Sequence, residues 1–284
     1  MQTEAPTSAV KVAETDAHEG PVYAPDEHAL YFTSVRAEHV AIKRLDLAGG
    51  DVSLLVEDAN TANGMALDRE GRLIVCEQGT LVEPACITRV DRATRAREVL
   101  VSGLSSPNDV VVRSDGTIWF TDPSYGWLQG FRPRPATRDR VYRYDPTSGE
   151  VAVASECFDK PNGIAFSPDE RVLYVGDSGA IHAPGDYDAG RPRRVVAFDV
   201  VDGDVRDERV FADEIPGYPD GLKTDSGGRV YVSCAEGVLV YAPDGRLLRL
   251  IELPGAVNFA FGPEERALYV TADTAVWAVD LEEE

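Results

Sequence analysis

The chain has 284 residues, of which 43% are hydrophobic, and a net charge of −21 from 49 acidic and 28 basic side chains. This excess of negative charge repels phosphate backbones and anionic lipid, which argues against binding to nucleic acids or membrane surfaces. No apolar run approaches the roughly 20 residues of a transmembrane helix, and the N-terminal "MQTEAPTSAVKVAETD" does not read as a secretory signal. We therefore expect a cytoplasmic globular protein, whose oligomeric state the sequence leaves open.

The cysteines are Cys76, Cys86, Cys157 and Cys234. Their spacing matches no zinc motif, and four cysteines in a chain of this length do not make a disulfide framework. We expect free and mostly buried thiols, with a Cys76–Cys86 bridge as the open alternative.

From the N-terminus onward, the chain repeats one unit. In each copy a polar residue opens a short apolar run, a turn rich in Gly, Asp or Pro follows, and a second apolar run ends the unit. The copies are "HEGPVYAPDEHALYFTSV", "ANGMALDREGRLIVCEQG", "PNDVVVRSDGTIWFTDPSYG", "KPNGIAFSPDERVLYVGDSG", "PDGLKTDSGGRVYVSCAEG" and "VNFAFGPEERALYVTAD". The opening polar residues, here called the anchors, are Glu19, Asn63, Asn108, Asn162, Asp220 and Asn258.

Further strand-like runs lie between these units, among them "CITRVDR", "AREVLVSG", "RRVVAFDV" and "RLLRLIEL". The runs are rich in Val, Ile, Tyr and Phe, turn residues separate them, and no stretch has the 3.6-residue period of a helix. Four short strands in about 40–50 residues, repeated six times, are typical of a β-propeller. We predict an all-β, six-bladed β-propeller with four antiparallel strands per blade, as a single domain over residues 1–284.

In this arrangement, the N-terminal part of the chain has one strand too many and the C-terminal part has one too few. The last unit supplies only three strands, whereas the run "AVKVAET" at residues 9–15 precedes the first anchor and has no blade of its own. We expect residues 9–15 to form the outer strand of the last blade, because this pairing closes the ring and removes exposed strand edges.

The innermost strand of each blade lines the channel of a propeller, so the anchors should form a ring at one end of it. Glu19, Asn108, Asn162 and Asp220 would then offer two carboxylates and two amides, which are ligands of hard cations. We expect one divalent metal ion, Ca²⁺ in the first place, with Mg²⁺, Mn²⁺ or Zn²⁺ as alternatives. The four histidines are dispersed and do not predict a His-based zinc site.

Two other interpretations of the anchors stay open. Asn-Gly is a common turn dipeptide, so Asn162 taken alone would be a turn residue. The ring as a whole could also be structural, a set of hydrogen-bonded caps. The periodic spacing and the carboxylates at Glu19 and Asp220 favour a binding site.

Several segments, in the same order, resemble the gluconolactonase, senescence-marker-protein and luciferin-regenerating-enzyme family. They are "EGPVY", "NGMALD", "LIVCEQG", "SPNDVVV", "DGTIWFTDPSYG", "KPNGIAFSPDERVLYVGDS" and "PDGLKTDSGGRVYVS", and they span nearly the whole chain. The resemblance implies a six-bladed propeller with one divalent metal and lactone hydrolysis. It also implies Glu19, Asn162 and Asp220 as metal ligands, Asn108 as a ligand or substrate contact, and Asp220 as the proton acceptor.

Two segments bear on the substrate. Animal members of the family carry an Arg two residues before the Asn that matches Asn108, where it helps to hold the sugar; here that residue is Ser106. The segment "CEQG" resembles the bacterial gluconolactonase branch, which usually has "CEHG". The animal-type sugar pocket is therefore not expected, and the physiological substrate is not fixed.

The expected reaction opens a sugar lactone such as gluconolactone. A metal would polarise the carbonyl while Asp220 takes a proton from the attacking water. As substrate contacts we expect Asn108, Asn63 and, from the insertion "TDPSYGWLQGF", Asp122 and Tyr125. Trp127 from the same insertion could also wall the pocket, Glu77 lies near the predicted channel mouth, and Asp177 closes a strand near the channel. A loop in the next insertion carries His182, Asp186 and Tyr187.

Two alternative functions would use the same site. One is hydrolysis of other lactones or of organophosphate esters. The other is a metal-stabilised propeller that binds a ligand without turnover. A strictosidine-synthase-like propeller is disfavoured, because that group lacks the ring of carboxylates and amides.

Overall fold

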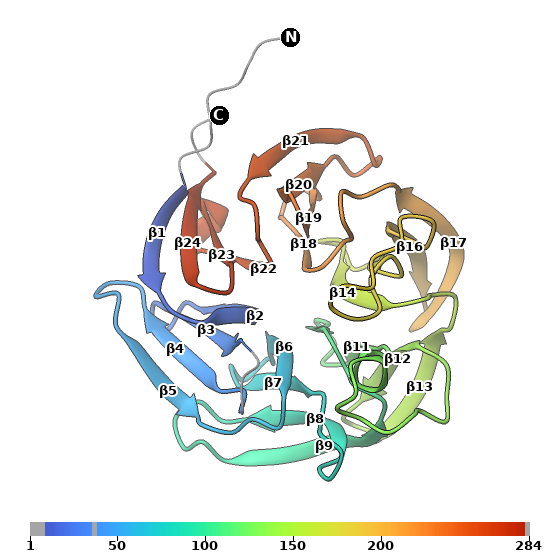
Figure 1. The fold of residues 1–284 in the computed structure, drawn as a ribbon, viewed down its shortest axis with the longest axis horizontal. Helices are drawn as coiled ribbons and strands as arrows, with labels where there is room; N and C mark the ends of the chain where they lie inside the picture. Colours follow the sequence, from blue (N-terminus) through green and yellow to red (C-terminus); the bar gives the residue numbers. More distant parts are fainter. Residues whose placement is uncertain (1–8, 36–38, 282–284) are drawn as a thin grey trace.

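A computed structural model describes residues 9–35 and 39–281 of the chain. Within these residues, six four-stranded antiparallel sheets are arranged as blades around a central axis (Figure 1). The predicted six-bladed β-propeller is confirmed. The described part of the chain contains two short helical segments, α1 (Tyr125–Leu128) and the 3₁₀ turn η1 (Pro263–Glu265), and no helix there is long and apolar enough to cross a membrane.

The first three blades follow one another along the chain, and each runs from an inner to an outer strand. The first contains β2 (Ala17–Ala24), β3 (Ala29–Ser34), β4 (Ile42–Asp46) and β5 (Val52–Val56). The second contains β6 (Ala62–Leu67), β7 (Leu73–Glu77), β8 (Ala85–Val90) and β9 (Arg97–Leu104). The third contains β10 (Val110–Val112), β11 (Ile118–Asp122), β12 (Arg140–Asp145) and β13 (Glu150–Ser155).

The other three blades repeat this order until the ring closes. The fourth contains β14 (Pro161–Phe166), β15 (Val172–Asp177), β16 (Arg194–Val201) and β17 (Asp204–Ala212). The fifth contains β18 (Leu222–Thr224), β19 (Val230–Cys234), β20 (Gly237–Tyr241) and β21 (Leu247–Glu252). The sixth contains β22 (Asn258–Phe261), β23 (Ala267–Thr271), β24 (Ala275–Asp280) and, as its outer strand, β1 (Ala9–Glu14).

The ring is closed by the N-terminal strand. β1 pairs antiparallel with β24, with Ala9 opposite Val279 and Glu14 opposite Ala275. Figure 1 shows this strand lying on the outside of the last blade, next to the first. The expected closure by residues 9–15 is therefore confirmed, with the strand ending one residue earlier.

The hydrophobic core consists of six layers, one between each pair of neighbouring blades. The layer between the first two blades, for example, packs Tyr31 and Ile42 against Met65 and Val75. Equivalent clusters fill the other five contacts, including the one between the last and first blades. Second strands such as β3, β7 and β19 are buried along their whole length because neighbouring blades cover both of their faces.

The cysteines contribute to these layers as free thiols. All four are unpaired, and Cys76, Cys86 and Cys234 are buried. Burial is the largest effect on Cys86 and raises the pKa of its thiol to about 12. The expectation of free, mostly buried thiols is confirmed, and the alternative Cys76–Cys86 bridge is not formed.

Candidate active site

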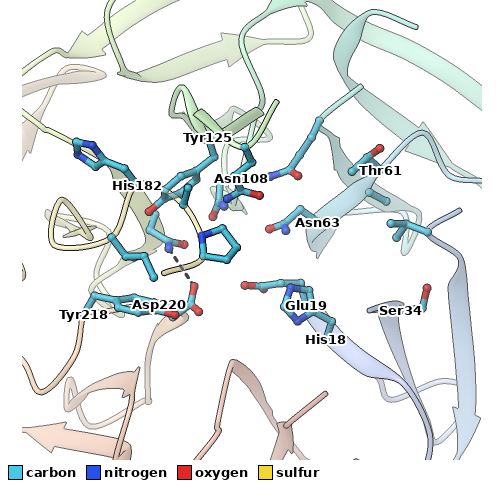
Figure 2. Close-up of a pocket in the computed structure, with 18 residues that line it drawn as sticks. His18, Glu19, Ser34, Thr61, Asn63, Asn108, Tyr125, His182, Tyr218 and Asp220 are labelled. Carbon is cyan, nitrogen blue, oxygen red and sulfur yellow. Dashed lines mark hydrogen bonds between the residues drawn. The ribbon is translucent and has the colours of Figure 1, made fainter. Parts of the chain in front are cut away.

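The inner strands bring five of the six anchors together at one end of the channel. Glu19, Asn63 and Asn162 lie within inner strands, whereas Asn108 and Asp220 each stand two residues before one. All five line a cavity of about 260 Å³ (Figure 2). Five of the six predicted anchors thus surround one cavity, and Asn258 does not line it.

The Asn-Gly pairs of the sequence occupy bulges within strands. The pairing of β14 with β15 shifts between Pro161 and Ile164, and that of β6 with β7 shifts between Ala62 and Met65. A bulge inserts an extra residue into a strand and redirects its side chains. Asn162 and Asn63 lie inside these shifts, so they are strand residues that face the cavity and not hairpin-turn residues.

The glycines that follow these anchors allow neighbouring blades to approach each other. Gly163 N donates a 3.0 Å hydrogen bond to Asp220 O, and Gly64 N donates a 2.8 Å bond to Asn108 O. A Cβ atom on Gly163 would lie 2.2 Å from Asp220 O. Only glycine permits this contact, which fixes one anchor against the next around the channel.

Two carboxylates, Glu19 and Asp220, point toward the same part of the cavity (Figure 2). Each is held by an amide: Asn258 Nδ2 donates to Glu19 Oε2 at 2.7 Å, and Asn162 Nδ2 donates to Asp220 Oδ1 at 2.9 Å. Gly20 N donates a further 3.1 Å bond to Glu19 Oε2. The two carboxylates are therefore oriented before any ligand binds.

Burial raises the pKa of Asp220 well above its usual range, and the neighbouring Glu19 carboxylate raises it further. The same two carboxylates act on Tyr218: the Asp220 charge, then burial, then Glu19 raise the pKa of that phenol. Burial opposes ionisation of His18, but its bond to Asp273 and the nearby carboxylates raise its pKa. The site thus has a strongly negative potential.

The composition of the site suits a divalent cation. Among the described residues, neither Glu19 nor Asp220 forms an ion pair with a lysine or arginine, although two buried like charges repel each other unless a cation compensates them. No three His, Cys, Asp or Glu side chains gather as a metal-binding group in the described ranges. The charged donors would be these two carboxylates, with oxygens of Asn162 and Asn108 completing an oxygen-only set.

Polar side chains without partners line the cavity beside Asn108. Tyr125 is 7% exposed, and its Oη has no hydrogen-bond partner among the described residues; the same holds for Asn63 Oδ1. Buried polar groups of proteins are nearly always paired, so such exceptions are typical of ligand sites. Figure 2 shows both side chains near Asn108 on this side of the cavity.

Ser106, which stands where animal relatives have an arginine, anchors the helical turn that carries Tyr125. Its Oγ donates a 2.7 Å hydrogen bond to Pro123 O and accepts a 2.9 Å bond from Gly126 N. The side chain is buried and does not line the cavity. A tyrosine on α1 therefore occupies this side of the site.

Asp122 does not line the cavity, although the sequence suggested it as a substrate contact. It is buried at the end of β11, and both its oxygens accept hydrogen bonds from Ser105 N at 3.0 Å. Its Oδ1 also accepts a 2.8 Å bond from Ser106 N. Its contact with substrate stays a prediction, while these bonds hold the loop that precedes Asn108.

Asp177 and Glu77 occupy equivalent positions at the ends of β15 and β7. Asp177 Oδ1 accepts backbone bonds from Asp159 and Lys160 at 3.1 and 2.9 Å. Glu77, 2% exposed, accepts bonds from Thr88, Asn60 and Arg97. Neither lines the cavity. These two acids therefore hold the loop segments that precede the anchors Asn162 and Asn63.

The insertion between β15 and β16 covers part of the mouth. His182 lines the cavity, and its Nε2 lies 3.1 Å from both carboxylate oxygens of Asp159, which holds the loop in place. Trp127, Asp186 and Tyr187 are exposed and lie outside the lining.

Several lining residues were not among the sequence candidates. Among them are His18, Gln78, Gln129 and Tyr218. A signal existed for His18 and Tyr218, because they stand one and two residues before the anchors Glu19 and Asp220. The sequence also did not show that the sixth anchor, Asn258, bonds to Glu19 from outside the cavity lining. Its residue type and spacing match those of the anchors that line the cavity, so nothing in the sequence set it apart.

Comparison with known proteins assigns the family. The sequence model of the SMP-30/Gluconolactonase/LRE-like region matches residues 17–274. The chain belongs to this family. This confirms the resemblance seen in the sequence.

Several similar proteins carry names that denote lactone hydrolysis. The gluconolactonase of Zymomonas mobilis is 28% identical over 286 aligned residues, which cover 89% of this chain and 75% of the relative. The pentonolactonase of Haloferax volcanii is 30% identical and covers 89% of this chain and 80% of its own. A solved structure described as a gluconolactonase, from Xanthomonas campestris, has a TM-score of 0.83 and 32% identity, and covers 96% and 89% of the two chains.

Proposed function

We propose that this protein is a metal-dependent hydrolase that opens sugar lactones. The names of its relatives, gluconolactonase and pentonolactonase, support lactone chemistry. The observation that carries the proposal is the pair of carboxylates, Glu19 and Asp220, that face one cavity without an ion-pairing lysine or arginine among the described residues. Such a pair is stable at neutral pH when a cation lies between its members.

Glu19, Asp220 and Asn162, with Asn108 beside them, would hold the metal. When bound, a divalent cation acts as a Lewis acid that polarises the lactone carbonyl and favours attack by water. Ca²⁺ is the cation we propose, since every donor is an oxygen and two of them are carboxylates. Mg²⁺ and Mn²⁺ share this preference for oxygen.

Asp220 would act as the proton acceptor. The attacking water forms a bond to the carbonyl carbon and gives one proton to an Asp220 oxygen. The bond from that carbon to the ring oxygen then breaks. The ring oxygen takes up the proton held by Asp220 and becomes a hydroxyl group of the open acid, which restores the Asp220 carboxylate. The 2.9 Å bond from Asn162 leaves the other Asp220 oxygen available for this transfer.

The part of the wall formed by Tyr125, Asn63 and Asn108 would bind the hydroxyl groups of the sugar. Tyr125 Oη and Asn63 Oδ1 are buried without partners in the described structure, so a donor and an acceptor are available there. The Gln78 and Gln129 side chains also line this cavity. Asn108, between the two groups, would contact the carbonyl oxygen or a sugar hydroxyl as negative charge develops.

A substrate panel tests this function. We expect ring opening of gluconolactone and of a γ-aldonolactone to exceed hydrolysis of an alkyl lactone and of a phosphotriester, because the latter two lack hydroxyl groups for the polar wall. Asp220→Ala should abolish turnover. Preference for the phosphotriester would change the substrate class. Turnover of any substrate that is unchanged in Asp220→Ala would contradict the catalytic role of Asp220. No turnover above the uncatalysed rate by wild type or Asp220→Ala, with metal still raising the melting temperature, would indicate a ligand-binding propeller.

A further inference from the structure

A second cavity, of about 440 Å³, lies at the other end of the channel. The inner strands run parallel to one another, and their last residues line it: Leu67, Val112, Phe166, Thr224 and Phe261. Phe166 stands four positions after Asn162 on β14, which at about 3.3 Å per residue is at most about 13 Å. This cavity is therefore distinct from the proposed active site, and the two share no lining residue.

The wall of this second cavity is mostly apolar. Five of the six inner strands contribute aliphatic or aromatic side chains, among them Val22, Met65, Val110, Ile164 and Phe261. The only charged side chains in the lining are Lys223 and Glu170. Glu170 is already engaged, because it accepts 2.6 Å bonds from Ser114 N and Oγ and pairs with Arg113. Lys223 is therefore the charge available to a ligand.

Lys223 is unusual among the lysines of this acidic chain, which are Lys11, Lys43, Lys160 and Lys223. The first three pair with carboxylates: Lys11 with Glu14, Lys43 with Asp16, and Lys160 with Asp139 and Asp159. Lys223 forms no ion pair within the described residues, although acids outnumber bases by 49 to 28. Lys223 is half-buried in this mostly apolar lining, so its ammonium is available to form a charge-assisted hydrogen bond with an anion.

The nearest candidate for a structural partner is the buried Asp109. Burial raises the pKa of Asp109 to about 6, and the Lys223 charge acts in the opposite direction, so the two groups interact. They are not paired, however: Asp109 Oδ1 accepts a 2.9 Å bond from Val110 N, and its Oδ2 has no hydrogen-bond partner in the described structure. Asp109 therefore acts on Lys223 only through space, and no carboxylate among the described residues forms an ion pair with the Lys223 ammonium.

We propose that this second cavity binds a small monocarboxylate with an apolar body. The carboxylate would accept hydrogen bonds from Lys223 Nζ, and its hydrocarbon part would contact Met65, Ile164 and Phe166. Lys223 is the one cationic side chain among the described residues of the lining, so the cavity offers no second positive charge to a phosphate or a dicarboxylate. The site does not depend on the lactonase proposal.

Calorimetry with benzoate tests the site, and benzyl alcohol serves as its uncharged analogue. We expect saturable 1:1 binding of benzoate and at least tenfold weaker binding of the alcohol. Lys223→Met should weaken benzoate binding about tenfold to a hundredfold, the usual effect of removing a hydrogen bond to a charged group. Lys43→Met, which removes the same charge from a surface ion pair, should leave it unchanged.

A carboxylate could also bind a metal at the other end of the channel, so the titration is repeated in EDTA. Benzoate affinity that vanishes in EDTA, or equals that of benzyl alcohol, or is unchanged in Lys223→Met, would overturn the proposal. If Lys223→Met does not fold, a crystal of the wild-type protein soaked in 4-bromobenzoate decides. Bromine anomalous scattering beside Lys223 supports the site, and its absence there overturns it.

Discussion

At the residue scale, Asn162 and Asn258 show how one side-chain type serves two purposes. Both are anchors at the start of an inner strand, and both donate an amide hydrogen bond to a carboxylate of the site. Asn162 lines the cavity itself, whereas Asn258, 1% exposed, lies behind Glu19. We interpret Asn258 as a positioning residue that orients Glu19 for a cation.

Asn258→Ala tests this positioning role. Loss of the 2.7 Å bond should weaken cation affinity about tenfold or more, as is usual when a group that orients a metal ligand is removed. Isothermal titration with Ca²⁺ measures this effect. Asn60→Ala is the matched control, since Asn60 donates to Glu77 outside the cavity. Equal affinity in Asn258→Ala and wild type would contradict the interpretation.

The carboxyl group of Asp122 should make stability depend on pH. Burial raises its pKa to about 6, despite the backbone bonds from Ser105 and Ser106. The folded state therefore binds this proton more tightly than the unfolded state does. The contribution of Asp122 to the free energy of unfolding should rise as pH falls from about 6 toward 4, by about 2–3 kcal/mol.

Asp122→Asn measures this contribution, because it keeps one acceptor oxygen and removes the titration. Denaturant unfolding at pH 4 to 7 should show the wild type gaining stability relative to the variant as the pH falls. A difference that is independent of pH would contradict the account.

At the scale of elements, the inner-strand bulges build the site. The register shifts in β6 and β14 turn Asn63 and Asn162 toward the channel, and the glycines that follow let the next blade approach. The sequence predicted the anchors from their repetition. It could not separate bulge from turn, because Asn-Gly suits both and the difference depends on pairing with the neighbouring strand.

Gly163→Ala tests the close approach of the fourth and fifth blades. The new Cβ would lie 2.2 Å from Asp220 O and 2.7 Å from Leu222 N, both backbone atoms. We expect a loss of about 3 kcal/mol in unfolding free energy, at the upper end for overpacking, and impaired activity. Gly227→Ala is the control, because its nearest atom is Asp225 Oδ1 at 3.4 Å. Similar unfolding free energies of the two variants would contradict this expectation, because they would mean that the fourth and fifth blades can move apart at little cost.

The helical turn α1 could not be predicted from a periodic pattern. Four residues, Tyr125–Leu128, are only one helical turn, and a period of 3.6 cannot be seen in so short a stretch. Its position depends on Ser106, about 20 residues earlier in the sequence, which accepts a bond from Gly126 N. Tyr125 was nevertheless expected at the pocket, because the insertion that carries it follows the third repeat.

At the scale of the whole molecule, repetition determined how much could be predicted. The six copies of one unit indicated the number of blades, because each blade packs against its neighbour in the same way. The last unit has only three strands and the N-terminal run has no blade of its own, which indicated the closing strand. Residues from the insertions, such as Gln129 and His182, break the repeat. Their placement at the cavity depends on single contacts, for example that of His182 with Asp159.

The whole molecule also places two carboxylates, 201 positions apart in the chain, at one end of the channel. The central claim is that Glu19 and Asp220 hold a divalent cation on which lactone opening depends. The most direct measurement follows gluconolactone opening after EDTA treatment and after add-back of Ca²⁺, Mg²⁺ or Mn²⁺. We expect loss of activity on chelation and recovery on add-back, with no recovery in Asp220→Asn. Full activity of the verified metal-free protein would contradict the central claim.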